Sequence, residues 1–460
     1  MKFKVLTFGC QMNVYDTGRI ERYLVAAGHE PALSEELADL LILNTCAIRD
    51  SAESRVYGTL GRLAHYKKER PGRMIAVAGC MAQKEGIELV KRSGVVDVVA
   101  GTHAIPRIPS LIEQAAAGMG PQVETARSES DLFDEPEYLP IRSGPLRYPA
   151  FVSIMQGCNK VCSFCVVPYT RGKEVCRPPE DVVAECVSLV RQGYREVTLI
   201  GQNVDSYRFE GVDFADLLAR VSRIEELSRI RFTTSHPQDI TPKLIDTVAE
   251  FDNICENFHF PLQAGSNRVL KEMKRGYVVE EYFEKLAYIE KVFGPRETRP
   301  FSYGISTDLM VGFANETEAE FEETLDAVRR ARWDSAFMFK YSRRERTAAH
   351  RWEDRVSEEE KSERLARLIE LQESISLSLN LLALGKTVEV LIEGLPGADP
   401  EQPLTRVKGR TRTNKVISLE TPEDPSEWPP IGETVEALVT DCKPVTLRGE
   451  MVGRTTSVGA

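Results

Sequence analysis

The sequence lacks any run that approaches the ~18 consecutive apolar residues of a membrane-spanning helix. The apolar stretch near its N-terminus is short and interrupted by Gly9, Gln11 and Asn13, unlike a signal peptide. Cations are in the minority, because 59 Lys and Arg stand against 70 Asp and Glu, a net charge of −11. We therefore expect a cytoplasmic protein without a membrane segment. The acidic balance also argues against a general phosphate-binding surface.

Cysteine is too scarce for a disulfide-dense secreted protein, and 42% hydrophobic with 28% charged residues excludes the collagen-like and disordered classes. In a reducing compartment, the ten cysteines are better explained by metal binding or catalysis than by disulfides. At about 150 residues per domain, the 460 residues predict roughly three domains.

Residues 1–118 alternate short apolar runs with amphipathic stretches of helical spacing. The apolar runs resemble buried parallel strands and cover residues 3–8, 40–43, 74–78 and 95–100. This βαβ order predicts a doubly wound α/β domain. Residues 119–149 are rich in Gly, Pro and acidic side chains, and we expect a linker there.

Residues 150–350 contain six alternating strand and helix signals. They predict a partial TIM-like (β/α) barrel, because a full eight-unit barrel usually takes about 250 residues. Residues 351–384 are charged, with apolar residues at helical spacing, and predict one connecting helix. Residues 385–455 contain short β segments, which predict a small antiparallel β-barrel. The expected fold class is α/β with this β-barrel at its C-terminus.

Cys158, Cys162 and Cys165 form a C-x3-C-x2-C run directly after a predicted strand. Three thiolates this close can bind three irons of a 4Fe–4S cluster and leave the fourth iron open. The C-terminal ends of barrel strands are where such enzymes place their chemistry, so an open iron there can chelate a substrate. The alternative is three buried or zinc-bound structural cysteines, although zinc normally needs a fourth Cys or His.

Cys10, Cys46 and Cys80 share a position rather than a spacing, because each lies within three residues of the end of a predicted strand. The carboxyl ends of neighbouring parallel strands meet at one edge of a sheet, where open α/β sheets bind ligands. A second three-cysteine cluster is therefore predicted. The alternative is three ordinary buried cysteines.

The C-x3-C-x2-C run resembles the signature of radical S-adenosylmethionine (SAM) enzymes. The segments FGCQMN, NTCAIRDSAE and GCMAQ are similar to the N-terminal domain of the methylthiotransferases within that group. QGCNKVCSFCVVPYTRGKE, GQNVDSY, FTTSHP and HFPLQAGSNRVLKEMKRGY resemble the branch that acts on isopentenylated adenosine in tRNA. The resemblance extends over about residues 3–450 in family order.

The resemblance implies two 4Fe–4S clusters with different duties. The cluster on Cys158, Cys162 and Cys165 would bind SAM and cleave it reductively to a 5′-deoxyadenosyl radical, which removes the hydrogen at carbon 2 of the adenine at position 37. The second cluster would carry the sulfur to be inserted, which a second SAM methylates. The resemblance also implies a reducing electron donor, flavodoxin-like or similar, and we expect a monomer.

The loops that follow predicted barrel strands supply candidate cofactor-binding residues. Residues 201–203 follow the second strand, and residues 235–236 follow the third. Position and resemblance together give cofactor-binding roles to Phe164, Gly201, Gln202, Asn203, Ser235, His236 and Gln263. Their polar groups suit the cofactor's ribose or carboxylate, or the substrate base. For His236, a structural loop histidine fits equally well.

Five cations at mostly alternate positions lie in the C-terminal segment: Arg406, Lys408, Arg410, Arg412 and Lys415. Alternate spacing places side chains on one face of a strand, where they suit phosphates, although a solvated strand is the alternative. This segment resembles a TRAM domain, a small RNA-binding β-barrel. Basic groups at 268–275 and 171–173 extend the expected positive path toward an adenosine in the anticodon loop.

Three segments depart from the family pattern: 175–177, 312–317 and 342–347. None of them includes a cysteine of the two predicted clusters, so the departures concern loop geometry. Two enzyme alternatives remain, which act on threonylcarbamoyladenosine in tRNA or on an aspartate of a small-subunit ribosomal protein. An RNA-binding iron–sulfur sensor without turnover is an alternative of another class.

Overall fold

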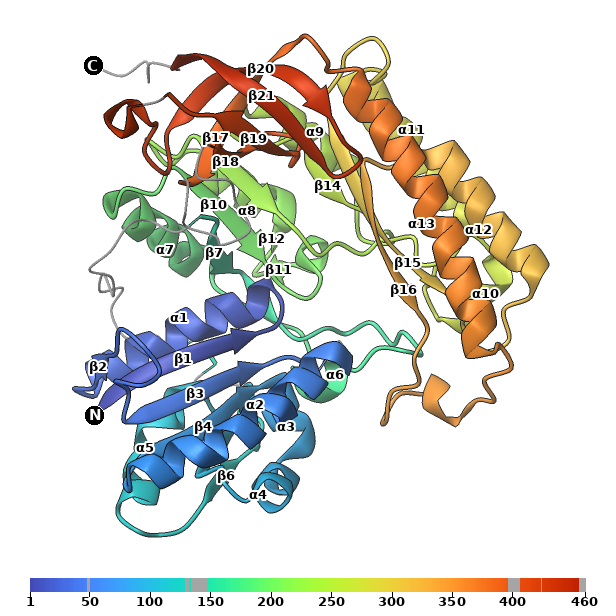
Figure 1. Ribbon diagram of the computed structural model, residues 1–460. Helices are drawn as coiled ribbons and strands as arrows, with labels where there is room; N and C mark the ends of the chain where they lie inside the picture. Colours follow the sequence, from blue (N-terminus) through green and yellow to red (C-terminus); the bar gives the residue numbers. More distant parts are fainter. Residues whose placement is uncertain (48–49, 129–131, 134–147, 396–405, 423, 455–460) are drawn as a thin grey trace.

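The computed structural model describes residues 1–460 except 48–49, 129–131, 134–147, 396–405, 423 and 455–460, and only the backbone of 50–53. In Figure 1 the N-terminal sheet (blue) lies below the central green and yellow strands, and the C-terminal β-barrel (red) lies above them. Within the described part of the chain, no helix is long and apolar enough to cross a membrane.

The N-terminal domain is a parallel six-stranded sheet in the order β2-β1-β3-β4-β5-β6. Its strands are β1 (Lys2–Phe8), β2 (Glu30–Pro31), β3 (Leu40–Thr45), β4 (Met74–Gly79), β5 (Val98–Ala100) and β6 (Gln122–Glu124). Its helices are α1 (Gln11–Ala26), α2 (Asp50–Glu69), α3 (Cys80–Glu85), α4 (Ile87–Ser93), η1 (Ile105–Arg107) and α5 (Ile108–Ala116).

Both faces of this sheet are covered. The helices α1 and α5 pack on one face and α2, α3 and α4 on the other. Every residue of β3 and β4 is buried, as expected for central parallel strands between two helical layers. The predicted doubly wound domain is confirmed. The sheet also includes β6, which lies in the stretch that the composition favours as a linker.

The central domain contains six parallel strands in chain order, arranged as two three-stranded sheets, β7-β10-β13 and β14-β15-β16. A bridge between Ile230 and Ile254 connects the two halves. The strands are β7 (Ala150–Ser153), β10 (Glu196–Ile200), β13 (Arg229–Phe232), β14 (Asn257–His259), β15 (Gly304–Val311) and β16 (Ser335–Lys340). This is the predicted partial (β/α) barrel.

Helices follow the strands and cover the outside of the barrel. They are α7 (Pro179–Arg191), α8 (Phe214–Val221), α9 (Pro242–Glu250), α10 (Asn267–Glu272), α11 (Val279–Phe293), α12 (Glu318–Ala331) and α13 (Glu358–Leu381). The predicted connecting helix is α13, which begins after Ser357 because this side chain caps the helix together with Glu360. It packs on β16 and α12 and so completes the outer layer (Figure 1).

Short elements occupy the connections. They are β8 (Met155–Gln156), α6 (Val167–Thr170), β9 (Val175–Cys176), η2 (Val204–Ser206), β11 (Arg208–Phe209), β12 (Val212–Asp213), η3 (Ala349–Arg351) and η4 (Pro425–Glu427). The antiparallel pair β8–β9 closes the base of the loop that carries the C-x3-C-x2-C run.

The C-terminal domain is a closed barrel in the order β17-β18-β19-β21-β20. Its strands are β17 (Thr387–Gly394), β18 (Arg406–Thr411), β19 (Val416–Glu420), β20 (Thr434–Cys442) and β21 (Thr446–Arg454). The predicted small β-barrel is confirmed, with one difference. The barrel closes through a parallel pair, β19 with β21, because β20 separates them in sequence and returns on the far side.

Candidate functional site

The first cysteine triad, Cys158, Cys162 and Cys165, lies in the loop between β8 and β9. Gly157 opens this loop with a φ of 82°, and a Cβ atom there would lie 1.9 Å from the carbonyl oxygen of Lys173. Only glycine permits this close approach of the two ends of the loop. The backbone N–H of Lys160 donates to Cys158 Sγ (3.4 Å), and that of Val167 donates to Cys165 Sγ (3.5 Å).

A buried cation completes the surroundings of the first triad. Arg275 Nη1 donates to Cys162 Sγ at 3.4 Å, and its Nη2 is held by the carbonyl oxygen of Pro261. Burial raises the pKa of Cys158, and it raises the pKa of Cys165 to about 12. Cys158 and Cys165 are therefore protonated at neutral pH unless a metal supplies positive charge. The donor groups around these sulfurs suit thiolates bound to a cluster.

The second cysteine triad, Cys10, Cys46 and Cys80, lies at one edge of the N-terminal sheet. Phe8 of β1 pairs with Thr45 of β3, and Thr45 pairs with Gly79 of β4, so the three strands end in register. Cys46 and Cys80 come one residue after their strands, and Cys10 comes two residues after its strand. Strand order thus brings together cysteines that are more than 30 positions apart in the sequence.

Two asparagines hold this edge of the sheet in place. Asn13 Nδ2 donates to Asn44 Oδ1 and to the carbonyl oxygen of Thr45, both at 3.1 Å. Asn44 Nδ2 returns a bond to the carbonyl oxygen of Asn13 at 2.8 Å. Gly79, with a φ of 92°, lies against this network, since a Cβ atom would be 2.5 Å from the Thr45 carbonyl oxygen.

The thiols of the second triad differ in how readily they lose a proton. Cys10 stands at the N-terminal end of α1, and its pKa is lowered to about 6, first by a hydrogen bond with Cys46. Burial opposes this shift, while the Arg171 charge and the backbone N–H groups of Asn13 and Met12 favour it. Burial raises the pKa of Cys80. Cys10 is therefore more prone to ionise to a thiolate than Cys80.

Within the described residues, no three Cys, His, Asp or Glu side chains converge tightly enough to hold a single metal ion. In a 4Fe–4S cluster each cysteine bonds a different iron, so the sulfurs stand farther apart than the ligands of one ion. Two sets of three thiols with sulfur-directed donors fit this donor pattern. They do not fit the compact tetrahedral site of a structural zinc ion.

The two triads approach each other where the N-terminal domain contacts the barrel. Cys10, Met12 and Tyr15 pack against Ile200, the last residue of β10, and against Phe151 of β7. Arg171, from the loop of the first triad, forms an ion pair with Asp16 of α1 at 2.7 Å. The second triad therefore faces the barrel mouth at which the first triad lies.

Most of the predicted cofactor-binding residues line this mouth. Gln202 Oε1 accepts a bond from the Gly157 N–H, and Asn203 Nδ2 donates to Asp239 Oδ2 at 2.6 Å. Asp239 also contacts Lys160 Nζ, from the loop of the first triad, at 2.8 Å. Gly201 is required because a Cβ atom would lie 2.5 Å from the side chain of Met155.

Ser235 and His236 are buried at the same mouth. The pKa of His236 is lowered to about 2, mainly by burial and then by the charge of Arg275, so its ring is neutral. Among the described residues, neither Asn203 Oδ1 nor His236 Nε2 has a hydrogen-bond partner. Buried polar atoms without partners are rare, and here they indicate room for a polar ligand.

Two predicted residues occupy more structural positions. Phe164 packs edge to face on Phe313, with ring centroids 6.2 Å apart. Gln263 is buried with a φ of 75° and bridges to Leu309 of β15 through its backbone. Both lie on the side of the mouth formed by β14 and β15.

The sequence reasoning missed residues on the inner face of the second half-barrel. Phe337 and Phe339 of β16 are 51% and 38% exposed, and they alternate with residues packed against α13. Asp308 pairs in register with Phe337, and its Oδ2 lies 3.4 Å from His259 Nε2. The sequence offered no signal for this, because Ala336–Phe339 is a continuous apolar run and only the burial of the strand alternates.

The alternation of the cations on β18 is confirmed, because Arg406, Lys408 and Arg410 are partly exposed and the residues between them are buried. The interpretation is wrong for Lys415 in the turn that follows. Lys415 is buried and contacts Asp334 at 2.9 Å, and Arg412 binds Glu256 at 2.7 Å. Both side chains attach the C-terminal barrel to the central domain, and Lys415 is closed to phosphates. Arg412 is as exposed as Arg406 and Arg410, which are likewise ion-paired, with Glu420 and Glu393.

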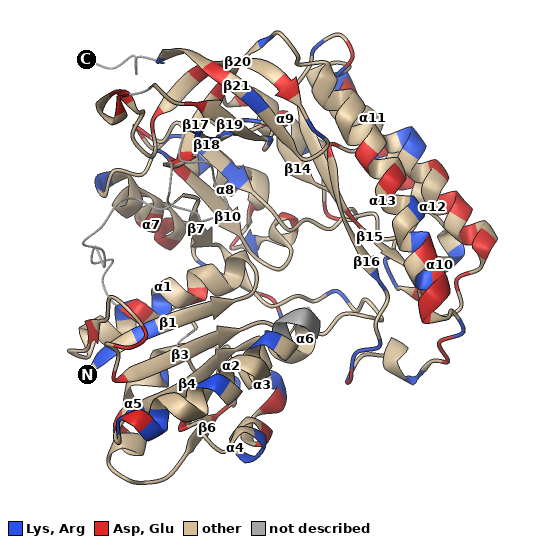
Figure 2. Ribbon diagram, in the orientation of Figure 1, with Lys and Arg blue, Asp and Glu red and all other residues tan. Residues whose placement is uncertain are grey.

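The basic groups at 268–275 and 171–173 are open only in part, because Lys173, Lys271 and Lys274 are exposed whereas the arginines of these groups are paired or buried. Arg268 binds Glu320 and Glu272, Arg275 is buried against Cys162, and Arg171 is buried against Asp16. Figure 2 shows Lys, Arg, Asp and Glu interleaved along α12 and α13, so that surface also lacks a single sign of charge.

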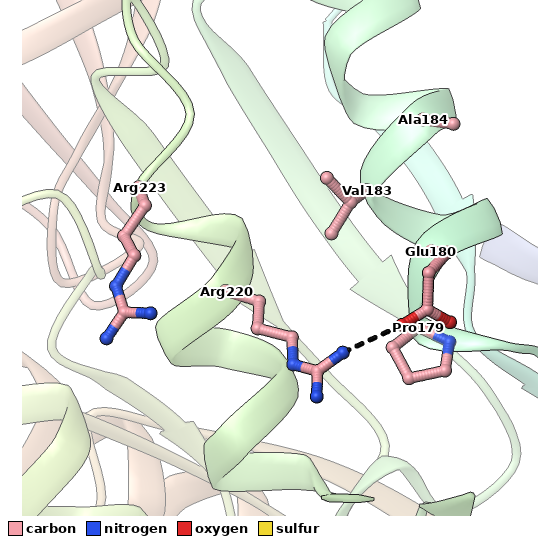
Figure 3. A pocket seen from close by; sticks show the side chains of 6 residues that line it. All are labelled: Pro179, Glu180, Val183, Ala184, Arg220 and Arg223. Carbon is pink, nitrogen blue, oxygen red and sulfur yellow. Dashed lines mark hydrogen bonds and ion pairs between the residues drawn. The ribbon is translucent and has the colours of Figure 1, made fainter.

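A surface recess between α7 and α8 lies apart from this site (Figure 3). Its lining includes Pro179, Val183 and Arg223, and Arg220 forms an ion pair across it with Glu180 at 2.9 Å. It belongs to the outer helical layer and contains none of the cysteines. The chemistry-bearing residues are therefore at the barrel mouth and not in this recess.

Comparison with known proteins agrees with this arrangement. Residues 2–101 match an uncharacterized protein family, UPF0004, residues 152–328 match the Radical SAM superfamily, and residues 382–452 match the TRAM domain. Cys10, Cys46 and Cys80 thus lie in the UPF0004 match. Cys158, Cys162 and Cys165 lie in the Radical SAM match. Membership of the Radical SAM superfamily implies a 4Fe–4S cluster and SAM, and the first triad lies within the matched residues.

Solved structures support the fold. A radical SAM methyltransferase, TsrM from Kitasatospora setae, superposes with a TM-score of 0.57 at 13% identity, over 76% of each chain. The cobalamin-dependent SAM radical enzyme OxsB gives a TM-score of 0.54 at 13% identity, over 81% of this chain and 56% of that one.

Two relatives match along almost the whole chain. The tRNA-2-methylthio-N(6)-dimethylallyladenosine synthase of Moorella thermoacetica is 43% identical over 98% of both chains. The protein of the same name from Carboxydothermus hydrogenoformans is 42% identical, over 98% of this chain and 99% of that one. With this similarity, and with the radical SAM and TRAM matches in the same order, the chain belongs to the tRNA-2-methylthio-N(6)-dimethylallyladenosine synthase family of radical SAM proteins.

Proposed function

We propose that this protein is a radical SAM methylthiotransferase that adds sulfur and a methyl group at carbon 2 of N(6)-isopentenyladenosine at position 37 of tRNA. One observation carries the proposal: two cysteine triads from two domains approach each other at one barrel mouth. A reaction that removes a hydrogen and inserts a sulfur at one carbon needs both chemistries beside one substrate. The names of the 42–43% identical relatives support the substrate.

The first triad would hold the cluster that binds SAM. When bound, a 4Fe–4S cluster of this type supplies the electron for reductive cleavage of SAM. The chain's part is to fix the three sulfurs and the cofactor in one orientation and to exclude water. The Gly157 closure, the N–H bonds to Cys158 and Cys165, and the buried Arg275 serve the first of these tasks.

The polar residues of the mouth would bind SAM itself. Asn203 and His236 each offer a buried polar atom toward the ligand space, and Ser235 is the sequence neighbour of His236. The neutral His236 ring can accept or donate one hydrogen bond without adding charge. Gln202 ties this loop to the loop of the first triad, so cofactor and cluster would be held as one unit.

The second triad would hold a second 4Fe–4S cluster that carries the sulfur to be inserted. Its three thiols leave one iron without a protein ligand, as an exchangeable sulfur requires. The low pKa of Cys10 and the strand-end position of all three residues support metal binding there. Burial of Cys46 and Cys80 would keep water from this cluster.

The RNA would reach the mouth across the C-terminal barrel and the open half of the central barrel. Arg406, Lys408 and Arg410 remain candidates for phosphate contacts, because they share the outer face of β18. Phe337 and Phe339 offer exposed rings on which a splayed base can stack. We further propose a monomer that receives electrons from a flavodoxin-like or similar donor.

The test is an anaerobic reaction of protein reconstituted with iron and sulfide. The reaction contains SAM, a reductant and a tRNA anticodon stem-loop with N(6)-isopentenyladenosine, and nucleoside mass spectrometry follows the product. We expect the 2-methylthio nucleoside together with 5′-deoxyadenosine. Methylthiolation only of threonylcarbamoyladenosine RNA, or only of a ribosomal protein aspartate, would overturn the substrate. Absence of 5′-deoxyadenosine in every reaction would instead indicate a sensor.

A further inference from the structure

Arg171 links the two cysteine triads through one buried side chain. Its backbone belongs to the loop of the first triad, just after α6, and its side chain ends in the N-terminal domain. There Nη2 donates to Asp16 Oδ2 at 2.7 Å, and the two side chains are 3% and 1% exposed. The guanidinium group also lies beside the Cys80 thiol and close to Cys10.

The backbone around Arg171 is held independently of its side chain. Thr102 Oγ1 donates to the Thr170 carbonyl oxygen at 2.6 Å, and His103 Nε2 lies 3.1 Å from the Arg171 carbonyl oxygen. The contact between the domains also includes the apolar packing of Met12 and Tyr15 against Ile200. The interface therefore has other means of attachment than this ion pair.

The ion pair is incomplete as a structural contact. Among the described residues, Arg171 Nη1 and Asp16 Oδ1 are buried and have no hydrogen-bond partner of good geometry. A buried charge with unsatisfied groups is destabilising, and a buried pair is often no better for stability than apolar packing. Stability alone therefore does not explain why a full positive charge is placed beside Cys80.

We propose that Arg171 is a positioning residue for the sulfur chemistry at the second triad, with its free Nη1 group directed to anionic sulfur held there. The anionic sulfur is a cluster thiolate, a cluster sulfide or the sulfur about to be inserted, all of which accept N–H bonds. This inference rests on the proposed function, since it needs a cluster on Cys10, Cys46 and Cys80. A fixed cation here stabilises the more negatively charged, reduced state of that cluster.

The position of Arg171 gives this charge a second consequence. Because its backbone lies in the loop of the first triad, ordering of that loop also places the cation at the second triad. The two sites are thus coupled through one short segment of chain, from Cys165 to Arg171, and through Asp16 on the other side of the interface.

The test uses the full chain with Cys158, Cys162 and Cys165 replaced by Ala, so that iron loads only at the second triad. Arg171→Gln, Arg171→Lys and Asp16→Asn are introduced into this parent. After anaerobic reconstitution with iron and sulfide, the midpoint potential is measured by redox titration with electron paramagnetic resonance. Iron content and thermal unfolding are measured on the same samples.

We expect the midpoint potential to become more negative in the order parent, Arg171→Lys, Arg171→Gln. Lysine lacks the rigid planar donor set of the guanidinium group, and glutamine lacks the positive charge as well. Asp16→Asn removes the ion pair and keeps the guanidinium, so it should lower stability without making the potential more negative.

A potential in Arg171→Gln equal to that of the parent, with equal iron content, would overturn the inference. If that variant does not fold, Arg171→Lys decides: a more negative potential supports the inference and an unchanged one contradicts it. A parent that binds no iron would overturn the proposed second cluster, and this inference with it.

Discussion

The two cysteine triads reach similar donor sets by different routes. Cys158, Cys162 and Cys165 lie within one loop, whose ends are fixed by the β8–β9 pair and by the close approach at Gly157. Cys10, Cys46 and Cys80 belong to three strand ends and meet only because β1, β3 and β4 are neighbours in register. The first site depends on local loop geometry, whereas the second depends on the topology of a whole domain.

This difference matters for function because each site can then change without the other. The loop of the first triad packs against barrel residues such as Arg275, while the second triad is surrounded by the Asn13–Asn44 network of the N-terminal sheet. Their immediate surroundings touch through the Arg171–Asp16 pair, the Thr102–Thr170 hydrogen bond and the packing of Cys10 near Ile200. Damage to one site should therefore leave the iron of the other in place.

Single cysteine substitutions test this independence with the largest effects. We expect Cys162→Ala to abolish 5′-deoxyadenosine formation, because an iron loses its ligand at the site that binds SAM. Cys46→Ala should spare SAM cleavage and stop methylthiolation. The measurements are 5′-deoxyadenosine and modified nucleoside by mass spectrometry, with iron analysis of the same samples.

The iron content gives the control for these variants. Two four-iron clusters predict about eight irons per chain in the unmodified protein and about four in either variant. Equal loss of both activities in Cys46→Ala would show that the sites are not separable. About four irons in the unmodified protein would leave the second triad without a cluster.

A glycine pair tests how strictly the second site depends on strand geometry. Gly79→Ala places a Cβ atom 2.5 Å from the Thr45 carbonyl oxygen at a φ of 92°. Gly72→Ala is the matched control, since its φ is 94° and nothing lies within 4 Å. Both variants carry the left-handed strain of ~1 kcal/mol, but only Gly79→Ala must shift the end of β3.

We expect Gly79→Ala to lose iron from the second triad and to retain SAM cleavage. Gly72→Ala should lose stability slightly and keep both. The checks are iron content, 5′-deoxyadenosine and thermal unfolding. If both glycine variants have the same effect, that effect comes from backbone strain and not from the close approach to Thr45. The second triad would then tolerate more movement of the strand ends than its geometry suggests.

The candidate cysteines could be predicted from sequence for different reasons. The first triad is a spacing motif, so it can be recognised without any prediction of the fold. The second triad needs the prediction that three apolar runs are adjacent parallel strands, which holds because βαβ order constrains their neighbours. Arg171 and Arg275 escaped this reasoning as site residues. Their role depends on which buried partner a cation meets, and sequence spacing contains no such information.

The cations of the C-terminal domain show the same limit. Lys408 and Lys415 look alike in sequence, yet Lys415 enters a buried contact with Asp334 and Lys408 lies on the outer face of β18. Burial opposes ionisation of Asp334, but Lys415 and Arg296 hold its pKa below the ordinary value. Hydrophobic alternation predicted the strand, whereas the contact between domains could not be predicted from one chain segment.

A lysine pair makes this contrast measurable. We expect Lys415→Met to lower the free energy of unfolding by about 3 kcal/mol, because it leaves the Asp334 carboxylate less compensated in a buried position. That contribution is present at neutral pH and is lost as the pH falls through the lowered pKa of Asp334. Lys408→Met should leave stability unchanged and weaken RNA binding, with the salt dependence reduced by about one ion.

Denaturant unfolding and binding titrations at several salt concentrations check this pair. Loss of RNA binding in Lys415→Met at full stability would show that its ammonium group is open to phosphates after all. An unchanged salt dependence in Lys408→Met would remove the outer face of β18 from the RNA path.

The smallest predicted effect concerns the space between the two triads. Phe337 and Phe339 lie exposed on the inner face of β16, whose other face packs against the core through the partly buried Ala336 and Met338. Exposed aromatic rings inside a barrel are otherwise unfavourable, and a stacked base would cover them. Base–aromatic stacking contributes about 1–3 kcal/mol per base, which corresponds to roughly tenfold or more in affinity.

We therefore expect Phe337→Ala and Phe339→Ala to weaken binding of the isopentenylated stem-loop by roughly tenfold, while iron content and SAM cleavage without RNA stay unchanged. Leu381→Ala, an exposed apolar residue at the end of α13, is the control and should have no effect. Fluorescence anisotropy with isopentenylated and unmodified stem-loops measures the difference. If the phenylalanine variants bind both RNAs as the unmodified protein does, the base does not stack on β16. The isopentenylated base would then be bound by other residues of the barrel mouth.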